Sequence, residues 1–351
     1  MFSLKKKNQK LLGVDIGTSA VKVLELSGAG GEMTIEHYAI EPLASGWVNE
    51  RQIADPVQVG DAVARAVLKS GSRLKLAAAC VPSSAVISKV VSMQKGLSDT
   101  EREAMVDMEA NRFVPYALDE VNIDFQVLGD SRTNPEEGEL QVIVCRKGVV
   151  DGVVDALQVA GLEPAAIDVD NLALGRVYER LLAPISAAEK ELAVLFDFGT
   201  ATTRLNVFDD GKLAYSRENV FGGRQLIDRV MAKYGRTYDE AAAALRAGDL
   251  PESYAQDVLK PFVKTMLQEI QRSLQFFYSS STHNAVDRLL LSGGCCALAA
   301  NIADLVEKNT GIPTVVADPF AGMRQGARVD SHFYRETPAL LLAGGLALRG
   351  I

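Results

Sequence analysis

The sequence predicts an α/β protein made of two related halves that face each other across a cleft. Apolar runs alternate with amphipathic stretches along most of the 351 residues, which is typical of alternating strands and helices. A short motif also occurs twice, since Asp15-Ile16-Gly17-Thr18 returns as Asp197-Phe198-Gly199-Thr200. In both copies an apolar strand precedes the motif, and a second apolar strand carrying a basic residue follows it. Each copy therefore predicts a β-hairpin with a glycine-containing tip.

Length and composition exclude several other classes of protein. A chain of this length suggests two or three domains. Hydrophobic residues make up 48% and charged residues 23%, which excludes a disordered chain, a collagen and a coiled coil. The net charge of -8 argues against nucleic-acid binding. The four cysteines show no C-x-x-C spacing, so we expect no zinc site and no disulfide framework, and a reducing cytoplasm as the location.

The sequence holds no apolar run that approaches the roughly 20 residues needed to cross a bilayer. The basic segment Lys5-Lys6-Lys7 leaves two interpretations open, contact with an anionic membrane surface or a solvated tail.

Local patterns predict the individual elements. Pro56–Ser70 and a long segment from about Tyr254 to Ser279 show helical periodicity, and an alanine run at Ala241–Ala244 favours a third helix. The predicted strands are Leu11–Ile16, Val21–Leu26, Met33–Ile40, Leu76–Val81, Val121–Val127, Gln141–Cys145, Leu192–Phe198, Arg204–Phe208 and Arg288–Leu291.

One further helix has a defined start. Ser98 and Glu101 form the S-x-x-E pattern of a helix N-terminus, and Pro115 is expected to end the helix. Its expected apolar face consists of Ala104, Met105 and Met108.

The two hairpin tips carry the groups that a triphosphate needs. Gly17 and Gly199 have no Cβ, so the backbone N–H groups can approach phosphate oxygens closely. Lys22 supplies a positive charge, and Asp15 and Asp197 are hard oxygen groups suited to Mg²⁺, held through its water molecules. The hydroxyl donors are Thr18, Ser19, Thr200 and Thr202. The competing interpretation is that D-x-G-T is only turn chemistry, which the duplication makes less favoured.

Two glycine pairs are candidates for a nucleoside site. The buried strand Leu289–Leu291 runs through Ser292 into Gly293-Gly294 and Cys295, an arrangement that lets a flat ligand lie against bare backbone. Gly222-Gly223 precedes a further helical pattern. Each pair taken alone is better explained by a tight connection that binds no ligand. The adjacent Cys295-Cys296 resembles a redox pair, but buried structural thiols are the favoured interpretation.

Taken together, these elements resemble the actin-like ATPase superfamily, with phosphate loops at Asp15–Lys22 and Asp197–Arg204 and an adenosine loop at Ser292–Ala297. Within it, the chain is similar to the PilM family, the FtsA-like proteins of type IV pilus assembly. The similarity rests on the opening Gly13–Lys22, on Glu109–Tyr116 with Leu118–Val121, on Asp318-Pro319-Phe320, and on the C-terminal Pro338–Arg349.

The resemblance implies a duplicated, ribonuclease-H-like fold with two lobes around a nucleotide cleft and an FtsA-type extra subdomain. It places the first lobe core at 1–85 and 165–191 and the inserted subdomain at 86–164. It places the second lobe core at 192–235 and 281–336, its helical subdomain at 236–280, and a C-terminal helix that returns to the first lobe at 337–351.

The resemblance also implies ATP and Mg²⁺ as ligands, with one departure. Relatives often carry a Glu and a Lys that reach the adenosine, and these positions fall on Ala242 and Leu245 here, which leaves Arg246 as the nearby cation. The expected nucleotide-binding residues are Asp15, Gly17, Thr18, Ser19, Lys22, Asp197, Gly199, Thr200, Thr202, Gly222, Gly223, Arg246, Gly293, Gly294 and Cys295, with the metal at Asp15 and Asp197.

The function that the resemblance implies is a cytoplasmic scaffold at the inner face of the inner membrane, which docks the cytoplasmic N-terminal tail of PilN beside the inserted subdomain. The candidate partner-binding residues are Arg112, Phe113, Val114 and Tyr116; for Phe113 and Val114, packing in the subdomain's own core is equally open. No Asp, Glu or His stands out as a general base, so we expect at most weak ATPase activity. The alternatives are a small-molecule kinase or phosphatase of the same superfamily, or a nucleotide-free scaffold.

Overall fold

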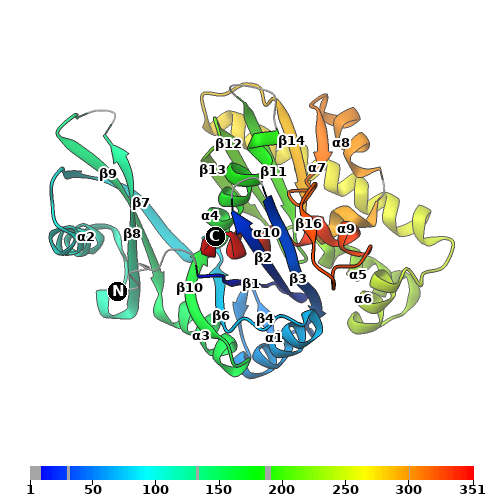
Figure 1. The fold of residues 1–351 in the computed structure, drawn as a ribbon. Helices are drawn as coiled ribbons and strands as arrows, with labels where there is room; N and C mark the ends of the chain where they lie inside the picture. Colours follow the sequence, from blue (N-terminus) through cyan, green and yellow to red (C-terminus); the bar gives the residue numbers. More distant parts are fainter. Residues whose placement is uncertain (1–8, 30–31, 132–133, 186–190, 300) are drawn as a thin grey trace.

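The computed structural model describes residues 9–29, 32–131, 134–185, 191–299 and 301–351, so the basic segment Lys5–Lys7 lies outside the described residues. Two sheets form the main body (Figure 1). The first lobe holds a six-stranded sheet in the order β10-β6-β1-β2-β3-β16, formed by β1 Leu12–Ile16, β2 Ala20–Ala29, β3 Glu32–Pro42, β6 Leu76–Val81, β10 Glu163–Val169 and β16 Arg324–Gln325. The second lobe holds a five-stranded sheet in the order β13-β12-β11-β14-β15, formed by β11 Leu192–Phe198, β12 Thr203–Asp209, β13 Lys212–Asn219, β14 Arg288–Ser292 and β15 Thr314–Val316.

The two sheets repeat one topology, which confirms the predicted duplication. The order β3-β2-β1-β6-β10 in the first lobe matches β13-β12-β11-β14-β15 in the second. In each, an antiparallel three-stranded meander continues into two parallel strands. Chain segments 180 residues apart therefore build equivalent scaffolds around the two D-x-G-T motifs.

Two helices lie between the sheets and form a common core. These are α4 (Asp170–Val177) and α10 (Leu341–Ala347), and the C-terminus lies in the centre of Figure 1 beside them. Their buried side chains pack with residues from both sheets, and Tyr178 stacks on Phe208 with ring centroids 4.0 Å apart. This shared core holds the lobes together.

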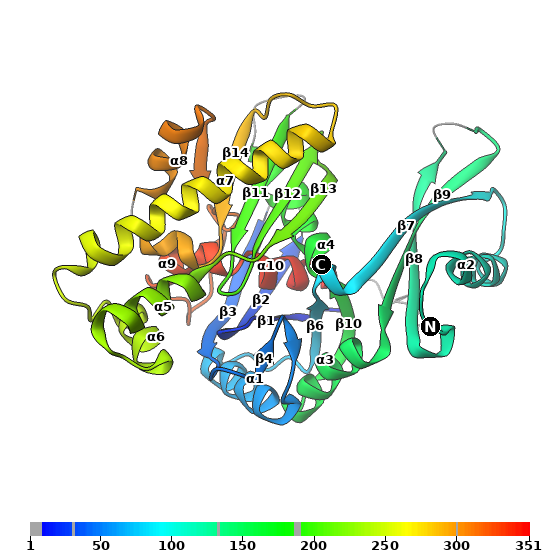
Figure 2. The ribbon, with the colours of Figure 1, turned by 180° about the vertical axis from the view of Figure 1, so that it is seen from behind.

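Other helices of the main body cover the outer faces of the sheets (Figure 2), whereas the short α9 (Phe333–Glu336) buries Phe333 in the common core. On the first lobe, α1 (Pro56–Ser70) begins at the N-cap Asp55 and ends at the left-handed Gly71, and it packs beside α3 (Lys147–Val159). On the second lobe, the long helix α7 (Lys260–Ser280) crosses the sheet. Its neighbours are α5 (Gly223–Tyr234), α6 (Tyr238–Ala247) and α8 (Ile302–Thr310).

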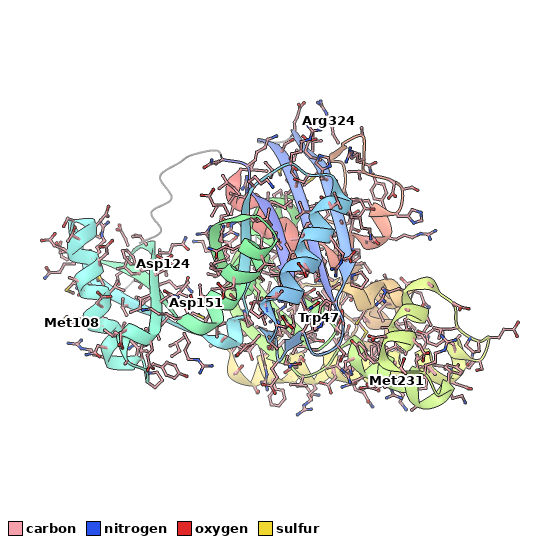
Figure 3. All side chains as sticks on the ribbon, turned by 90° about the horizontal axis from the view of Figure 1, so that it is seen from below. Trp47, Met108, Asp124, Asp151, Met231 and Arg324 are labelled. Atoms are coloured by element: carbon pink, nitrogen blue, oxygen red, sulfur yellow. The ribbon has the colours of Figure 1, made fainter. Side chains whose placement is uncertain are left out.

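A small three-stranded unit projects from the main body (Figure 1). It consists of the sheet β7-β9-β8 with α2 (Asp99–Phe113) and has its own apolar core; its strands are β7 Val86–Gln94, β8 Val121–Asp130 and β9 Glu137–Arg146. In Figure 3, Met108 and Asp124 lie on this unit, at the opposite end of the molecule from Met231 on α5. The predicted capping box of Ser98 and Glu101 is confirmed.

The expected apolar face of α2 was only partly correct. Met105 packs against the core of the small unit, but the helix buries Val106 and Ala110, whereas Ala104 is exposed and Met108 is 48% exposed. Because α2 has few apolar residues, its sequence pattern does not distinguish two neighbouring stripes. The small side chains face the sheet, where they allow close packing, and the long Met108 side chain faces outward.

The segment after the small unit packs with the first lobe. Val153, Ala156 and Leu157 of α3 are buried against α1, and β10 pairs in parallel with β6. The chain thus leaves the small unit at the end of β9, before α3 begins. Within the described residues, no helix is long and apolar enough to cross a bilayer.

Candidate functional site

The two hairpin tips have equivalent backbone geometry. Gly17 N–H donates to the carbonyl of Ala20 over 3.0 Å, and Gly199 N–H donates to the carbonyl of Thr202 over the same distance. A Cβ at Gly199 would lie 2.9 Å from that carbonyl oxygen, so the turn requires a residue without a side chain. Thr18, on the first tip, is half-buried.

Each hairpin also places an acid beside a base across its two strands. Asp15 is in register with Lys22, whose Nζ lies 2.7 Å from Oδ2, and Asp197 is in register with Arg204, which binds it through Nε at 3.0 Å. Both carboxylates are almost fully buried. A buried charge requires such a partner, which explains why a basic residue recurs seven positions after each Asp.

The tips of the two hairpins meet. The hydroxyl oxygens of Ser19 and Thr200 lie 2.5 Å apart, so the structure brings the two predicted phosphate loops into direct contact. Both loops follow the carboxyl ends of central strands, β1 and β11.

The second hairpin rests on the two glycine pairs. Gly223 N–H donates to the carbonyl of Gly199 at 3.0 Å, and a Cβ at Gly222 would lie 2.4 Å from the same oxygen. Gly293 has φ +92°, and a Cβ there would lie 2.2 Å from the carbonyl oxygen of Phe198. These glycines therefore allow the close backbone packing that supports the second hairpin. This agrees with the interpretation of the glycine pairs as tight connections between elements. Gly294 differs, because a Cβ at that position would meet nothing within 4 Å.

The adjacent cysteines are buried structural groups. Burial raises the pKa of the Cys295 thiol to about 12, and its Sγ lies 3.4 Å from the carbonyl oxygen of Gly199. Burial also raises the pKa of Cys296. Neither forms a thiolate at neutral pH, so they pack behind the hairpin without reactive chemistry.

The expected adenosine grip is only partly present. Ala242 and Leu245 pack into the core of the second lobe, whereas Arg246 is exposed near the end of α6. Burial raises the pKa of the neighbouring Tyr238, and the Arg224 guanidinium stacks on the Tyr238 ring at 4.6 Å. The backbone N–H of Arg224 donates to the carbonyl of Thr200, so Tyr238 is linked through Arg224 to the second hairpin.

Sequence reasoning missed the charged centre of the site. Asp170, with 0% exposure, accepts from Nη1 of Arg204 at 2.8 Å and lies 2.6 Å from Nη1 of Arg51. Burial would raise the pKa of Asp170, but Arg204 and Arg51 lower it to about 2. Arg51 also binds Glu218 at 2.5 Å. Asp170 directly follows the strand β10 and is the first residue of α4, and this position was its only signal in the sequence. Arg51 and Glu218 had no such signal.

This arrangement fits poorly with direct binding of Mg²⁺ by Asp197. Its Oδ2 accepts from Arg204 and its Oδ1 accepts from Ser292 Oγ at 3.0 Å, so a metal ion would have to displace one of these donors. The described residues contain no group of three or more metal-ligating side chains. Asp15, with one oxygen bound to Lys22, is the better candidate for contact through metal-bound water.

A cavity of 560 Å³ lies where both lobes meet the small unit. The first lobe contributes Arg51, the second contributes Thr202 and Glu218, and the small unit contributes mostly apolar side chains with Tyr116 and Arg146. Arg146 lies over the Tyr116 ring at 5.7 Å.

The four predicted partner-binding residues divide into three environments. Phe113 and Val114 pack against the core of the small unit, which is the alternative to partner binding that the sequence left open for them. Arg112 is exposed and pairs with Glu109 on the same helix. Tyr116 lines the cavity.

Two duplicated lobes around paired D-x-G-T hairpins define an actin-like fold, and comparison with solved structures agrees. The chain resembles the ethanolamine utilization protein EutJ from Carboxydothermus hydrogenoformans (TM-score 0.56, 14% identity, 99% of this chain and 94% of that one). It also resembles an archaeal actin homolog in complex with ADP (TM-score 0.50, 14% identity, 97% and 99% of the two chains). Both likenesses establish the fold.

Closer similarity gives the family. Residues 13–351 match the family of the type IV pilus assembly protein PilM, and the chain belongs to this family. A structure described as the PilM–PilN type IV pilus biogenesis complex matches with a TM-score of 0.79 and 25% identity over 98% of this chain and 99% of that one. The chain is therefore an actin-like scaffold of the pilus assembly platform, as the resemblance implied.

Proposed function

We propose that the chain binds ATP between its two hairpins and docks the cytoplasmic N-terminal tail of PilN at the inner face of the inner membrane. The observation that carries the nucleotide part is the meeting of the two equivalent tips at Ser19 and Thr200. A triphosphate that lies beside the point where the tips meet would receive N–H groups from both lobes and the partly exposed Lys22 ammonium.

The metal enters this proposal only as the counter-ion of the nucleotide. Mg²⁺ keeps several of its waters and is commonly held by one or two carboxylates plus the phosphates. We assign Asp15 as the carboxylate that contacts such a water, and Asp197 as a partner of Arg204. Gly294, with open space beside it, and the exposed Arg246 are the proposed contacts of the nucleoside.

The cavity is the proposed site of the PilN tail. Its walls combine apolar side chains of Val86, Ile87 and Val144 with the polar groups of Tyr116 and Arg146. An extended peptide with apolar side chains fits this lining, since apolar surface provides affinity and a few polar groups provide orientation. The proposed binding site thus lies at the base of the small unit. Phe113 and Val114 belong to the core of that unit, and neither they nor the exposed Arg112 line the cavity.

We also propose a narrower partner-binding unit than 86–164. Because α3 and β10 pack with the first lobe, the unit is 86–146, and the first lobe core extends over 1–85 and 147–191. For the rest of the chain we propose the bounds that the resemblance implies. These are 192–235 with 281–336 for the second lobe core, 236–280 for its helical subdomain and 337–351 for the C-terminal helix.

Titration calorimetry tests the peptide-binding part of the proposal. A synthetic PilN N-terminal peptide is expected to bind the intact chain with roughly micromolar affinity, about 8 kcal/mol, because an extended peptide loses conformational entropy on binding. Binding should weaken in Val220→Asp, which places a charge at an exposed position of the cavity wall, and persist in Val315→Asp, which changes an exposed valine on β15 outside the cavity. Failure of the peptide to bind the unmodified chain would refute the partner assignment.

A further inference from the structure

The two hairpins differ in how far their basic residue reaches. Lys22 and Arg204 hold equivalent positions, each in register with the Asp of its own D-x-G-T motif. The Lys22 side chain is 21% exposed and binds Asp15 of the same hairpin. The Arg204 side chain is 10% exposed and binds Asp170, at the start of α4, in addition to its own Asp197. The second hairpin therefore places a buried cation between two acids that come from different elements.

Both oxygens of Asp197 already have donors. Nε of Arg204 donates to Oδ2 at 3.0 Å, and Nη2 of Arg204 donates to the same oxygen. Oδ1 accepts from Ser292 Oγ at 3.0 Å. A metal ion that bound Asp197 directly would have to displace the guanidinium or the hydroxyl group.

The oxygens of Asp170 are occupied as well. Oδ2 accepts from Nη1 of Arg204 at 2.8 Å and lies 2.6 Å from Nη1 of Arg51. Oδ1 accepts from the backbone N–H groups of Ser83 at 3.0 Å and Asn171 at 2.7 Å. Since Asp170 is 0% exposed, a hydrated ion reaches it only if one of these contacts is lost.

The charge on Arg204 is permanent. Burial alone would lower the pKa of Arg204, but Asp197, Asp170 and Asp15 raise it well above its usual range. A guanidinium stays charged in proteins and offers a planar set of N–H donors to carboxylates, whereas Mg²⁺ needs an octahedral set of oxygen ligands and keeps several waters. The Arg204 side chain thus neutralises the two acids as a divalent ion would, in a space that a hydrated ion cannot share.

We propose that Arg204 takes the place of a metal ion between Asp170 and Asp197, so that these two carboxylates bind no Mg²⁺ and the second hairpin carries its own fixed cation. Mg²⁺ then reaches the site only with the nucleotide, on the side of Asp15. Removal of Arg204 should create a metal site from the acids that it now holds. The inference deepens the proposed function and rests on it for the nucleotide, because it names the cation that serves each hairpin.

The first test needs no nucleotide. Mn²⁺ substitutes for Mg²⁺, and the loss of the electron paramagnetic resonance signal of free Mn²⁺ measures how much of it the full chain binds. The unmodified chain is compared with Arg204→Thr, because threonine suits a strand and carries no charge. We expect Arg204→Thr to bind one Mn²⁺ per chain more than the unmodified chain. Its thermal midpoint should rise with Mg²⁺, unlike that of the unmodified chain, because an ion that binds only the folded state stabilises it.

Arg65→Thr is the matched control. It removes the same charge from an exposed pair with Glu41 and should bind no more Mn²⁺ than the unmodified chain. If Arg204→Thr does not fold even with Mg²⁺, the double variant Arg204→Thr/Asp170→Asn replaces it, since removing a cation together with an anion leaves fewer buried charges unpaired. Asp197 then has a free oxygen, and the double variant is expected to bind more Mn²⁺ than Asp170→Asn alone.

The second test measures ATP binding by calorimetry, in Mg²⁺ and in EDTA. Removal of Mg²⁺ should weaken ATP binding at least about 10-fold more in Arg204→Thr, or in the double variant where it is used, than in the unmodified chain, which corresponds to about 1.4 kcal/mol. The reason is that the variant has exchanged a fixed cation for a removable one.

Two outcomes overturn the proposal. A folded variant without Arg204 that gains neither Mn²⁺ nor thermal stability in Mg²⁺ would refute the role of Arg204. An equal effect of Mg²⁺ removal on ATP binding in the unmodified chain and in the variant would refute it as well. Absence of ATP binding by the unmodified chain would instead refute the proposed function, and the Mn²⁺ comparison, which uses no nucleotide, would still decide the role of Arg204.

Discussion

The hydroxyl groups of Ser19 and Thr200 lie 2.5 Å apart across the space between the lobes, although 181 residues separate them in the chain. Thr200 is the last residue of the second D-x-G-T motif and Ser19 directly follows the first, and each motif lies at the end of a central strand of its own sheet. The duplication thus brings two related short motifs to one point.

Nucleotide binding should stabilise the chain measurably. At about 100 times Kd, Mg²⁺–ATP is expected to add about 2.7 kcal/mol to the free energy of unfolding, visible as a rise in the thermal midpoint. Asp15→Ala should abolish this rise without unfolding the chain, because Lys22, 21% exposed, can turn to solvent. Glu41→Ala, which removes the partner of Arg65, should keep it. A thermal midpoint that does not change with nucleotide, in protein purified without nucleotide, would favour the nucleotide-free alternative.

ATP turnover should be slow. The buried carboxylates at the hairpins, Asp15, Asp170 and Asp197, are all paired with Lys or Arg, so none of the three is available as a general base at neutral pH. Hydrolysis is expected below about 1 s⁻¹, the low end of common enzyme rates. A phosphate-release assay on protein free of contaminating ATPases provides the measurement, and faster steady turnover would contradict the expectation.

Tyr116 and Phe113 should have different roles despite their proximity in sequence. Tyr116→Ala removes a side chain from the cavity wall, and the affinity for the PilN peptide should fall about 10-fold, or about 1.4 kcal/mol, with little change in stability. Phe113→Ala removes a side chain from the core of the small unit, where Lys89 Nζ lies 4.9 Å from the ring centroid. It should lower stability by roughly 2 kcal/mol. Calorimetry and chemical unfolding of both variants distinguish these effects; equal losses of affinity would contradict the division.

Asp170 should make stability depend on acid. Its pKa in the folded chain is about 2, below the roughly 3.9 of an unperturbed Asp, because of Arg204 and Arg51. A depressed carboxyl pKa stabilises the fold above about pH 4, and this contribution of about 2 kcal/mol is lost as the pH falls toward about 2. Urea unfolding of the unmodified chain and of Asp170→Asn across this range measures it.

Asp170→Asn should show a smaller dependence of stability on acid. At neutral pH its free energy of unfolding should fall by about 3–5 kcal/mol, since Arg204 and Arg51 lose a buried partner. Asp304→Asn, at an exposed site on α8, is the matched control. Identical pH profiles for the unmodified chain and Asp170→Asn would contradict the assignment.

The sequence by itself determined the parts of this protein that depend on local pattern. Apolar runs specified most strands of the two sheets, and the repeated D-x-G-T motif specified both hairpins. These features follow from residues within one hairpin, whereas the ion pairs Asp15–Lys22 and Asp197–Arg204 were seen only in the structure. The capping box at Ser98 is local in the same way.

Only the tertiary structure decided which distant groups meet. Arg51, Asp170 and Glu218 come from three separate segments, and no local pattern marks them as one charged cluster. The buried stripe of α2, the separation of Tyr116 from Phe113, and the packing of α3 with the first lobe also depended on the partner surface. The physical reason is that burial and ion pairing are properties of two surfaces in contact, whereas sequence periodicity describes only one of them.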